Sequence, residues 1–277
     1  MKKSICFLLL SLPLFTLWFC TSSSTGREKE NSDPGHSGVV KAGYKNVAVL
    51  ELFTSQGCSS CPAADGLLGT YTAKENVIAL SYHVDYWDRL GWKDAFSSAD
   101  YSKRQNEYAR WLNLSQVYTP QIIVNGKKEF VGSQEGALRN AIKSSLQESG
   151  DVQLNLNVTR NVNNTALVQY KVEENTGNSN NVISLVLVQK QAVIKVERGE
   201  NGGRTLAHAQ IVRNLQTQSL SKNTGSATLA LPAGFSAQGW EVIGFVQNTS
   251  NGAVLGASKA QFKVTAAIDR RDTPSIQ

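Results

Sequence analysis

Long basic runs, methionine and histidine are scarce in this 277-residue sequence, and each scarcity excludes a class of protein. The net charge is +6, but the basic residues are spread out, so the clustered charge of a nucleic-acid interface is missing. The three histidines are widely separated and cannot supply the second ligand pair of a structural zinc site. With 41% hydrophobic and 18% charged residues, the composition indicates a folded globular protein.

The start of the chain resembles a secretory signal peptide. A short basic segment precedes an apolar run from Ile5 to Phe19, which at about fifteen residues is short for a transmembrane helix. We predict a signal peptide over residues 1–20, followed by a polar tether over residues 21–44. The residues before Cys20 match a lipobox only in part, so a lipid anchor at Cys20 and a freely secreted form both stay open. We expect export to the periplasm or outer cell envelope, with membrane contact only through that anchor.

Cysteine usage points to chemistry rather than to stabilisation. Cys6 leaves with the signal peptide, and Cys20 is either lipidated or removed, so Cys58 and Cys61 form the only available pair. Both lie within one turn, and a disulfide that closes so small a loop constrains the unfolded chain very little. Because an exported protein is free to use long-range disulfides, this choice favours a redox role.

The flanks of the pair support a redox centre. An apolar segment at residues 47–54 predicts a buried strand, and residues 62–72 have helical spacing, so Cys58 and Cys61 lie between a strand and a helix start. The helix N-terminus stabilises the thiolate of the first cysteine, and the second resolves the mixed disulfide. A redox-active disulfide is the expected reactive group, with no bound cofactor and no metal.

The rest of the first half predicts a thioredoxin-type order. A strand at residues 77–82 is followed by a helical insertion at about residues 86–116, in which Ser97 or Ser98 is expected to cap a helix, and then by a strand entered through Thr119-Pro120 at the place of a cis proline. Asn125-Gly126 predicts a tight hairpin, and leucine and isoleucine at steps of four predict a closing helix at residues 138–146.

Several polar residues are candidates for a supporting role. His83, Asp85, Tyr86 and Trp87 follow the second strand, so we expect them at the sheet edge near Cys58, where ligands gather in parallel sheets. Glu51 interrupts the first strand. One interpretation is a buried proton acceptor for the second thiol. Glu51 lies one residue farther from Cys58 than is usual for that role, so the other interpretation is a solvated residue at the sheet edge.

Three stretches of the first half resemble a known family: Leu50 to Asp65, Tyr82 to Asp94 and Tyr118 to Gln121. They are similar to the bacterial secreted, thioredoxin-like domain of unknown function 1223. The resemblance covers most of residues 45–265. It implies a periplasmic or secreted thioredoxin fold with a redox role, and it names no substrate.

The second half has the sequence pattern of a β-protein. Alternation from Val152 to Val158 predicts a half-buried strand, and about eight short strands separated by polar turns suggest a β-sandwich. His208 is interpreted as structural or solvated, and the stretch from Arg198 to Arg204 as a flexible loop that could face the redox domain. We therefore predict an α/β thioredoxin-like domain with a helical insertion at residues 45–149, an all-β sandwich-like domain at residues 150–265, and a flexible tail at residues 266–277.

Three functions fit these observations. The first is an exported thiol–disulfide oxidoreductase, in which Cys58 attacks, Cys61 resolves and Thr119-Pro120 offers its backbone to an extended substrate. Its partners would be thiols or disulfides of proteins or small molecules, including an envelope redox partner. The second is a non-catalytic envelope binding or assembly module. The third is copper relay through Cys58, Cys61 and His83, although this chain lacks the methionines common in such sites.

Overall fold

The structure is a computed structural model that describes residues 46–148, 150, 152–161, 163–173 and 180–262. The predicted signal peptide, tether and tail, with Cys6 and Cys20, lie outside the described residues. The helices are α1 Cys61–Gly69, the 3₁₀ turn η1 Asp88–Leu90, α2 Ala99–Trp111 and α3 Glu135–Gln147. The strands are β1 Ala48–Thr54, β2 Val77–His83, β3 Gln121–Val124, β4 Lys128–Val131, β5 Gln153–Asn161, β6 Thr165–Glu173, β7 Asn181–Lys195, β8 Thr205–Ser219, β9 Thr224–Ala230, β10 Trp240–Asn248 and β11 Val254–Gln261.

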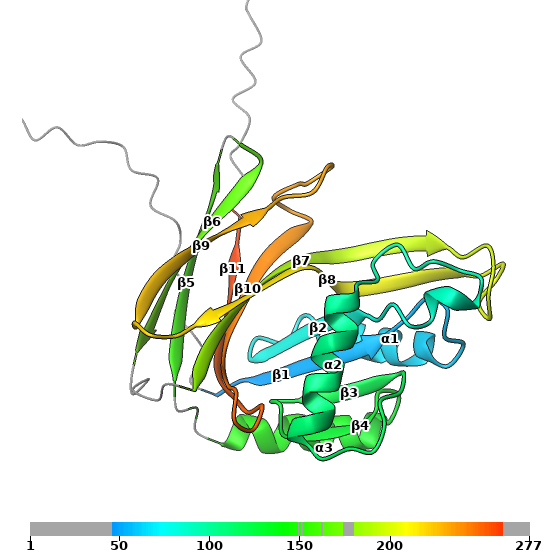
Figure 1. Cartoon of the computed structure of the whole chain (residues 1–277), viewed down its shortest axis with the longest axis horizontal. Helices are drawn as coiled ribbons and strands as arrows, with labels where there is room; N and C mark the ends of the chain where they lie inside the picture. Colours follow the sequence, from blue (N-terminus) through cyan, green and yellow to red (C-terminus); the bar gives the residue numbers. More distant parts are fainter. Residues whose placement is uncertain (1–45, 149, 151, 162, 174–179, 263–277) are drawn as a thin grey trace, which may run out of the picture. The chain divides into compact units, whose positions relative to one another are not determined.

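One eight-stranded mixed sheet combines both halves of the chain (Figure 1), in the order β11-β10-β7-β8-β2-β1-β3-β4. β1 pairs in parallel with β2 and antiparallel with β3. On its other side, β2 meets β8 in parallel, with Ser81 opposite Ile211. β7 and β8, 15 residues each, form a long antiparallel hairpin. The second half of the chain therefore extends the sheet that carries the cysteine pair.

This topology contradicts the predicted fold class. A thioredoxin-like α/β domain followed by a separate β-sandwich is wrong, because β7, β8, β10 and β11 join β1 to β4 in one sheet. The described part of the chain is mostly β, with three short α-helices. Alternation and apolar runs predict that a segment is a strand, but they do not specify which neighbour it pairs with. Among the described residues after residue 150 there are seven strands, where about eight were expected, because two predicted segments merge into β7.

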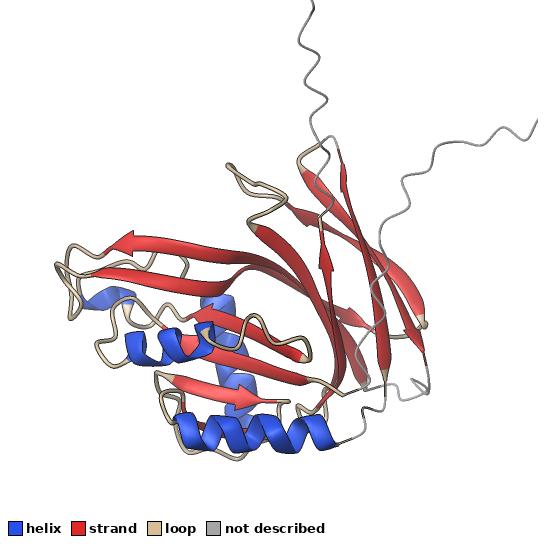
Figure 2. Cartoon of the chain, turned by 180° about the vertical axis from the view of Figure 1, so that it is seen from behind, coloured by secondary structure: helices blue, strands red, loops and turns tan. Residues whose placement is uncertain are grey.

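Helices cover both faces of the β1–β3 region. Leu50 and Leu52 of β1 pack with α1 and α3 on one face, which Figure 2 shows toward the viewer. Phe53, Tyr82 and Tyr108 pack on the other face, where α2 lies. The predicted helical insertion is thus built into the main core, and none of the helices in the described residues has the length and hydropathy needed to cross a membrane.

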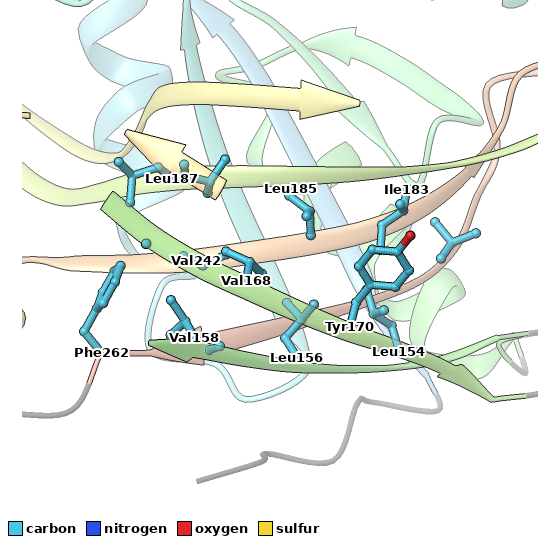
Figure 3. Packing of buried hydrophobic residues seen from close by; sticks show 14 of the residues in the cluster. Leu154, Leu156, Val158, Val168, Tyr170, Ile183, Leu185, Leu187, Val242 and Phe262 are labelled. Carbon is cyan, nitrogen blue, oxygen red and sulfur yellow. The ribbon is translucent and has the colours of Figure 1, made fainter. Parts of the chain in front are cut away.

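A third core lies between the eight-stranded sheet and a second sheet of order β5-β6-β9. Figure 3 shows Leu154, Leu156 and Val158 of β5 facing Leu185 and Leu187 of β7. Val186 and Val188 of β7 point to the α2 side, so the strand is buried on both faces from Ile183 to Val188. That is why this part of β7 is apolar except for Ser184.

Several local predictions are confirmed. Asn125 and Gly126 both have positive φ, 49° and 68°, as the tight turn between β3 and β4 requires. Ser98 caps α2, its Oγ accepting a hydrogen bond from the Asp100 N–H at 3.2 Å. The Thr119–Pro120 peptide bond is cis. Short-range signals of this kind depend on few residues, which is why they are visible in the sequence.

Candidate functional site

Cys58 and Cys61 are joined in a disulfide at the start of α1, with Cα atoms 5.4 Å apart. Cys61 is the first residue of the helix and Pro62 the second, where proline is tolerated because it needs no hydrogen-bonded N–H. Cys58 lies three residues earlier, in a turn closed by the Cys61 N–H donating to the Cys58 carbonyl at 3.2 Å. The side chains are 1% and 0% exposed, so the disulfide is buried.

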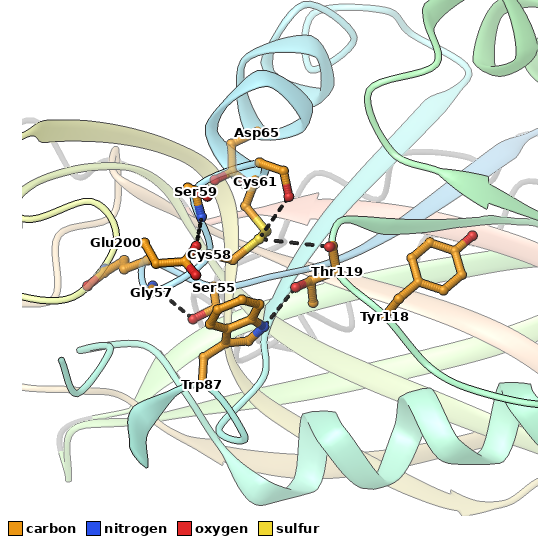
Figure 4. The surroundings of a disulfide bond; sticks show 12 residues. Ser55, Gly57, Cys58, Ser59, Cys61, Asp65, Trp87, Tyr118, Thr119 and Glu200 are labelled. Atoms are coloured by element: carbon orange, nitrogen blue, oxygen red, sulfur yellow. Dashed lines mark hydrogen bonds between the residues drawn. A yellow bond between two sulfur atoms is a disulfide. The ribbon is translucent and has the colours of Figure 1, made fainter. Parts of the chain in front are cut away.

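Two oxygen atoms lie beside the Cys58 sulfur (Figure 4). The Ser60 Oγ is 3.3 Å from the Cys58 Sγ, and the Thr119 carbonyl oxygen is 3.8 Å from it. After reduction, the Ser60 hydroxyl can donate a hydrogen bond to the thiolate, which favours the ionised form. The Thr119 carbonyl can instead accept from the thiol. The Cys58 sulfur thus has one neighbour that can stabilise the thiolate and another that can accept a hydrogen bond from the neutral thiol.

Trp87 fixes the segment that faces the disulfide. Its Nε1 donates to the Thr119 Oγ1 at 2.8 Å, and its ring lies next to Gly57. A Cβ at Gly57 would lie 3.3 Å from the Trp87 Cβ, so this close approach favours glycine. Of the residues predicted near Cys58, Thr119, Pro120 and Trp87 lie together there.

The β7–β8 loop, which contains the segment from Arg198 to Arg204, packs on the turn that carries Cys58. Asn201 is 0% exposed, and its Nδ2 donates to the carbonyls of Gln56 and Cys58, both at 2.9 Å. The Glu200 Oε2 accepts from the Ser59 N–H at 2.9 Å, and hydrogen bonding from Ser59 lowers the pKa of the Glu200 carboxyl. We therefore expect this loop to cover the Cys58 sulfur and to limit access to it.

Asp94 organises the turn before Cys58. Its Oδ2 accepts from the Gln56 N–H at 2.8 Å and lies 2.7 Å from the His83 Nδ1, while its Oδ1 accepts from the Phe96 N–H at 2.8 Å. Burial alone would raise the pKa of the Asp94 carboxyl, but the facing His83 and these hydrogen bonds outweigh burial and lower it. His83, expected at an open edge, is instead 0% exposed.

Glu51 and Asp85 are not near the disulfide chemistry. Glu51 is 1% exposed and receives two hydrogen bonds from Arg104, at 2.6 and 2.9 Å, and one from the Tyr108 hydroxyl. It is therefore not a solvated edge residue, and it lies on the α2 side of the sheet, opposite α1. Asp85 accepts from the Ser102 hydroxyl of α2. These two carboxylates position α2.

The donor set around the cysteines bears on the predicted copper relay. Among the described residues, no group of three or more His, Cys, Asp and Glu side chains has the arrangement of a metal site. The copper relay through Cys58, Cys61 and His83 thus gains no support from the donor set.

Comparison with known proteins adds the family. A family model described as a protein of unknown function, DUF1223, matches residues 49–247, from β1 into β10. The chain belongs to the DUF1223 family. The match includes Cys58, Cys61, Thr119, Pro120 and the β7–β8 loop, so the whole candidate site lies within the family region.

Two solved structures resemble this DUF1223 protein. A crystal structure of a protein from Agrobacterium tumefaciens has 27% sequence identity and a TM-score of 0.62, covering 80% of this chain and 98% of that one. HBP35 of Porphyromonas gingivalis has 17% identity and a TM-score of 0.55, covering 86% of this chain and 82% of its own. At that identity, HBP35 shows a similar fold and nothing more. None of the curated proteins compared with the sequence matches it.

Replacing Asn201 with alanine in this DUF1223 protein should uncover the disulfide. The carbonyls of Gln56 and Cys58 would lose a buried donor, which should lower the free energy of unfolding by about 1–3 kcal/mol. Reduction of the disulfide by dithiothreitol should become severalfold faster. Urea unfolding and thiol release measure the two effects. Asn106→Ala, at an exposed position on α2, is the control, and equal stability and reduction rates in both variants would disprove the covering role.

Two polar residues near the cysteines in this DUF1223 protein are not singled out by the sequence, namely Asn201 in the predicted loop and Asp65 on α1. His208, predicted to be structural or solvated, is buried at 3% exposure and contacts Asp65. The sequence does contain one signal for Asp65. It follows Cys61 by four residues, so its carboxylate falls on the buried face of α1, with Ala64 and Leu68.

Proposed function

We propose that this chain is an exported thiol–disulfide oxidoreductase that acts on thiols or disulfides of proteins or small molecules. The observation that supports it best is a Cys58–Cys61 disulfide at a helix start, with the Thr119 backbone beside the Cys58 sulfur. A loop this short gives a disulfide little value as a staple. The apolar start of the sequence supports an extracytoplasmic location, where disulfides persist.

The exchange would run through Cys58. A substrate thiolate attacks the Cys58 sulfur, a new sulfur–sulfur bond forms, and Cys61 leaves with the bonding electron pair as a thiolate. A second substrate thiol then attacks the substrate sulfur of the mixed disulfide and releases Cys58. The substrate is oxidised and the Cys58–Cys61 pair is reduced, and the reverse sequence transfers a disulfide back. Thr119 and the cis Pro120 would line the path of an extended substrate.

One observation favours a non-catalytic alternative. Both sulfur atoms are buried, and Asn201 and Glu200 hold the loop over them. An envelope binding or assembly module would use the same disulfide only to close the turn before α1. In that case the bridge would be inert toward thiols, and the two sheets would present the binding surface.

The reduction potential of the Cys58–Cys61 pair separates the two functions. We expect a potential above about −250 mV and a Cys58 thiol pKa below about 8.5, as in catalytic dithiols. Equilibration with glutathione buffers gives the potential, and the rate of alkylation against pH gives the thiol pKa. A potential below about −300 mV with an ordinary thiol pKa would refute the oxidoreductase and favour the binding module.

A further inference from the structure

A cluster of buried titratable side chains lies behind the disulfide. Asp65 of α1, His83 of β2, Asp94 and His208 of β8 are each no more than 5% exposed. The Asp65 Oδ2 is 3.4 Å from the His208 Nδ1, and the Asp94 Oδ2 is 2.7 Å from the His83 Nδ1. The two imidazole rings lie 4.9 Å apart, centre to centre, at an angle of 75°. The two carboxylate–imidazole pairs are therefore in contact through the His83 and His208 rings.

The cluster differs from a purely structural network in its open hydrogen-bonding positions. Within the described residues, Asp65 Oδ1, His83 Nε2 and both ring nitrogens of His208 have no hydrogen-bond partner in the protein. Buried polar atoms are normally paired, because an unpaired one loses its hydration without compensation. Open positions on a carboxylate and an imidazole are positions where a proton can be taken up or given away.

The two carboxylates are not equivalent. Both oxygens of Asp94 are occupied, by the N–H groups of Gln56 and Phe96 and by His83, so Asp94 is held as an anion. Asp65 has a free Oδ1 and only the longer contact to His208. Of the two pairs, only Asp65 with His208 therefore has a carboxylate oxygen that is left open.

Asp65 also has the right place relative to the resolving cysteine. It follows Cys61 by four residues on α1, so the two side chains lie on one face of the helix, about 5–6 Å apart at Cβ. Figure 4 shows Asp65 next to Cys61 on this helix. β8 packs along α1, with Ala209 close to Gly69, which brings His208 to Asp65.

We propose that the Asp65–His208 pair supplies the proton to the Cys61 sulfur when the disulfide opens, and takes it back when the disulfide closes. This inference rests on the proposed function. An incoming thiolate forms a bond to the Cys58 Sγ, the bond between Cys58 and Cys61 breaks, and Cys61 receives the electron pair. The proton held by the Asp65–His208 pair moves to the Cys61 Sγ, and the pair becomes one charge more negative. Asp65 and His208 are thus positioning and proton-transfer residues for the leaving sulfur.

Burial gives the physical reason. Cys61 is 0% exposed, and burial disfavours the charged form of a thiol, so leaving as an unprotonated thiolate would be slow. Among the charged and titratable groups around the pair, His83 of β2 contacts His208 directly, and Asp94 of the following loop binds His83. Arg213 of β8 stacks on the Phe96 ring, which contacts His208, and Glu200 and Arg204 of the β7–β8 loop bind Ser59 and Asn201.

The test is the pH dependence of disulfide reduction by dithiothreitol in the full-length protein. In the wild type, the rate should rise with the thiolate fraction of the reductant and then fall below that trend as the pair loses its proton. Asp65→Asn should be at least about tenfold slower at pH 7, and its rate should follow the reductant thiolate alone. His208→Gln should show the same change of profile. Glu241→Gln, which alters a buried carboxylate bound to Gln210 and Gln261, should keep the wild-type profile.

Each outcome decides the inference. Parallel pH profiles for the wild type and both variants would overturn it, as would a wild-type rate that follows only the reductant thiolate. If Asp65→Asn does not fold, by circular dichroism, His208→Gln and the wild-type profile still decide. This test does not depend on whether the proposed function is correct, because dithiothreitol reduces a structural disulfide and a catalytic disulfide by the same chemistry. A reduction potential below about −300 mV, together with a wild-type rate that falls below the reductant thiolate trend, would refute the proposed function and still support proton transfer by Asp65 and His208.

Discussion

Cys58→Ser should abolish disulfide exchange, whereas Cys61→Ser should accumulate a mixed disulfide between Cys58 and the substrate. In the first variant the sulfur beside the Thr119 backbone, where an extended substrate would lie, is gone. In the second, Cys58 can attack a substrate disulfide but no resolving thiol remains. We expect a loss of at least about 1,000-fold for Cys58→Ser, in line with removal of a covalent nucleophile. Insulin reduction and mass spectrometry of the trapped adduct measure the two effects.

The two variants serve as controls for each other. Both remove the disulfide, so any loss of stability should be nearly equal, and only the position of the remaining sulfur differs. Activity retained by Cys58→Ser, or an adduct formed equally by both variants, would contradict the assignment of Cys58 as the attacking residue.

Arg104→Met should be the most destabilising single change on the α2 side. Glu51 would keep a buried charge without its partner, which typically costs about 3–5 kcal/mol. The variant that also carries Glu51→Leu should recover much of this loss, since it leaves no charge behind. Exchange activity per folded molecule should stay unchanged in Arg104→Met, because the ion pair lies on the opposite face of the sheet from α1.

An exposed ion pair provides the matched comparison. Lys127 and Glu148 are 3.4 Å apart with side chains about half exposed, 53% and 50%, so Lys127→Met should change stability by less than about 1 kcal/mol. Urea unfolding of the two variants measures the difference. Similar losses of unfolding free energy for Arg104→Met and Lys127→Met would show that burial does not determine how much the Glu51–Arg104 ion pair stabilises the protein.

The sequence predicts the local structure well and the assembly poorly. The Asn125-Gly126 turn, the Ser98 cap and the disulfide pair each depend on a few adjacent residues, and the structure contains all three. The pairing of β8 with β2 depends on residues more than a hundred positions apart, and no short pattern specifies it. The predicted division into two folds was wrong for that reason.

The candidate site divides in the same way. Thr119, Pro120 and Trp87 come from the same half of the chain as the cysteines, and their approach to Cys58 was predictable from strand order. Asn201 and His208 arrive with β7 and β8, so their roles became visible only with the topology. A polar residue on an otherwise apolar helical face, such as Asp65, is the kind of signal that sequence analysis can use.

A loop that Asn201 holds over the disulfide, through its hydrogen bonds to the Gln56 and Cys58 carbonyls, would make any exchange selective by rate rather than by driving force. Dissolved oxidants and small thiols would meet a sulfur that is 1% exposed, and would have to wait for the β7–β8 loop to open. A partner whose backbone supplies donors to the Gln56 and Cys58 carbonyls would replace the Asn201 amide as it enters. Such a partner would react in preference to a far more abundant small thiol of equal potential.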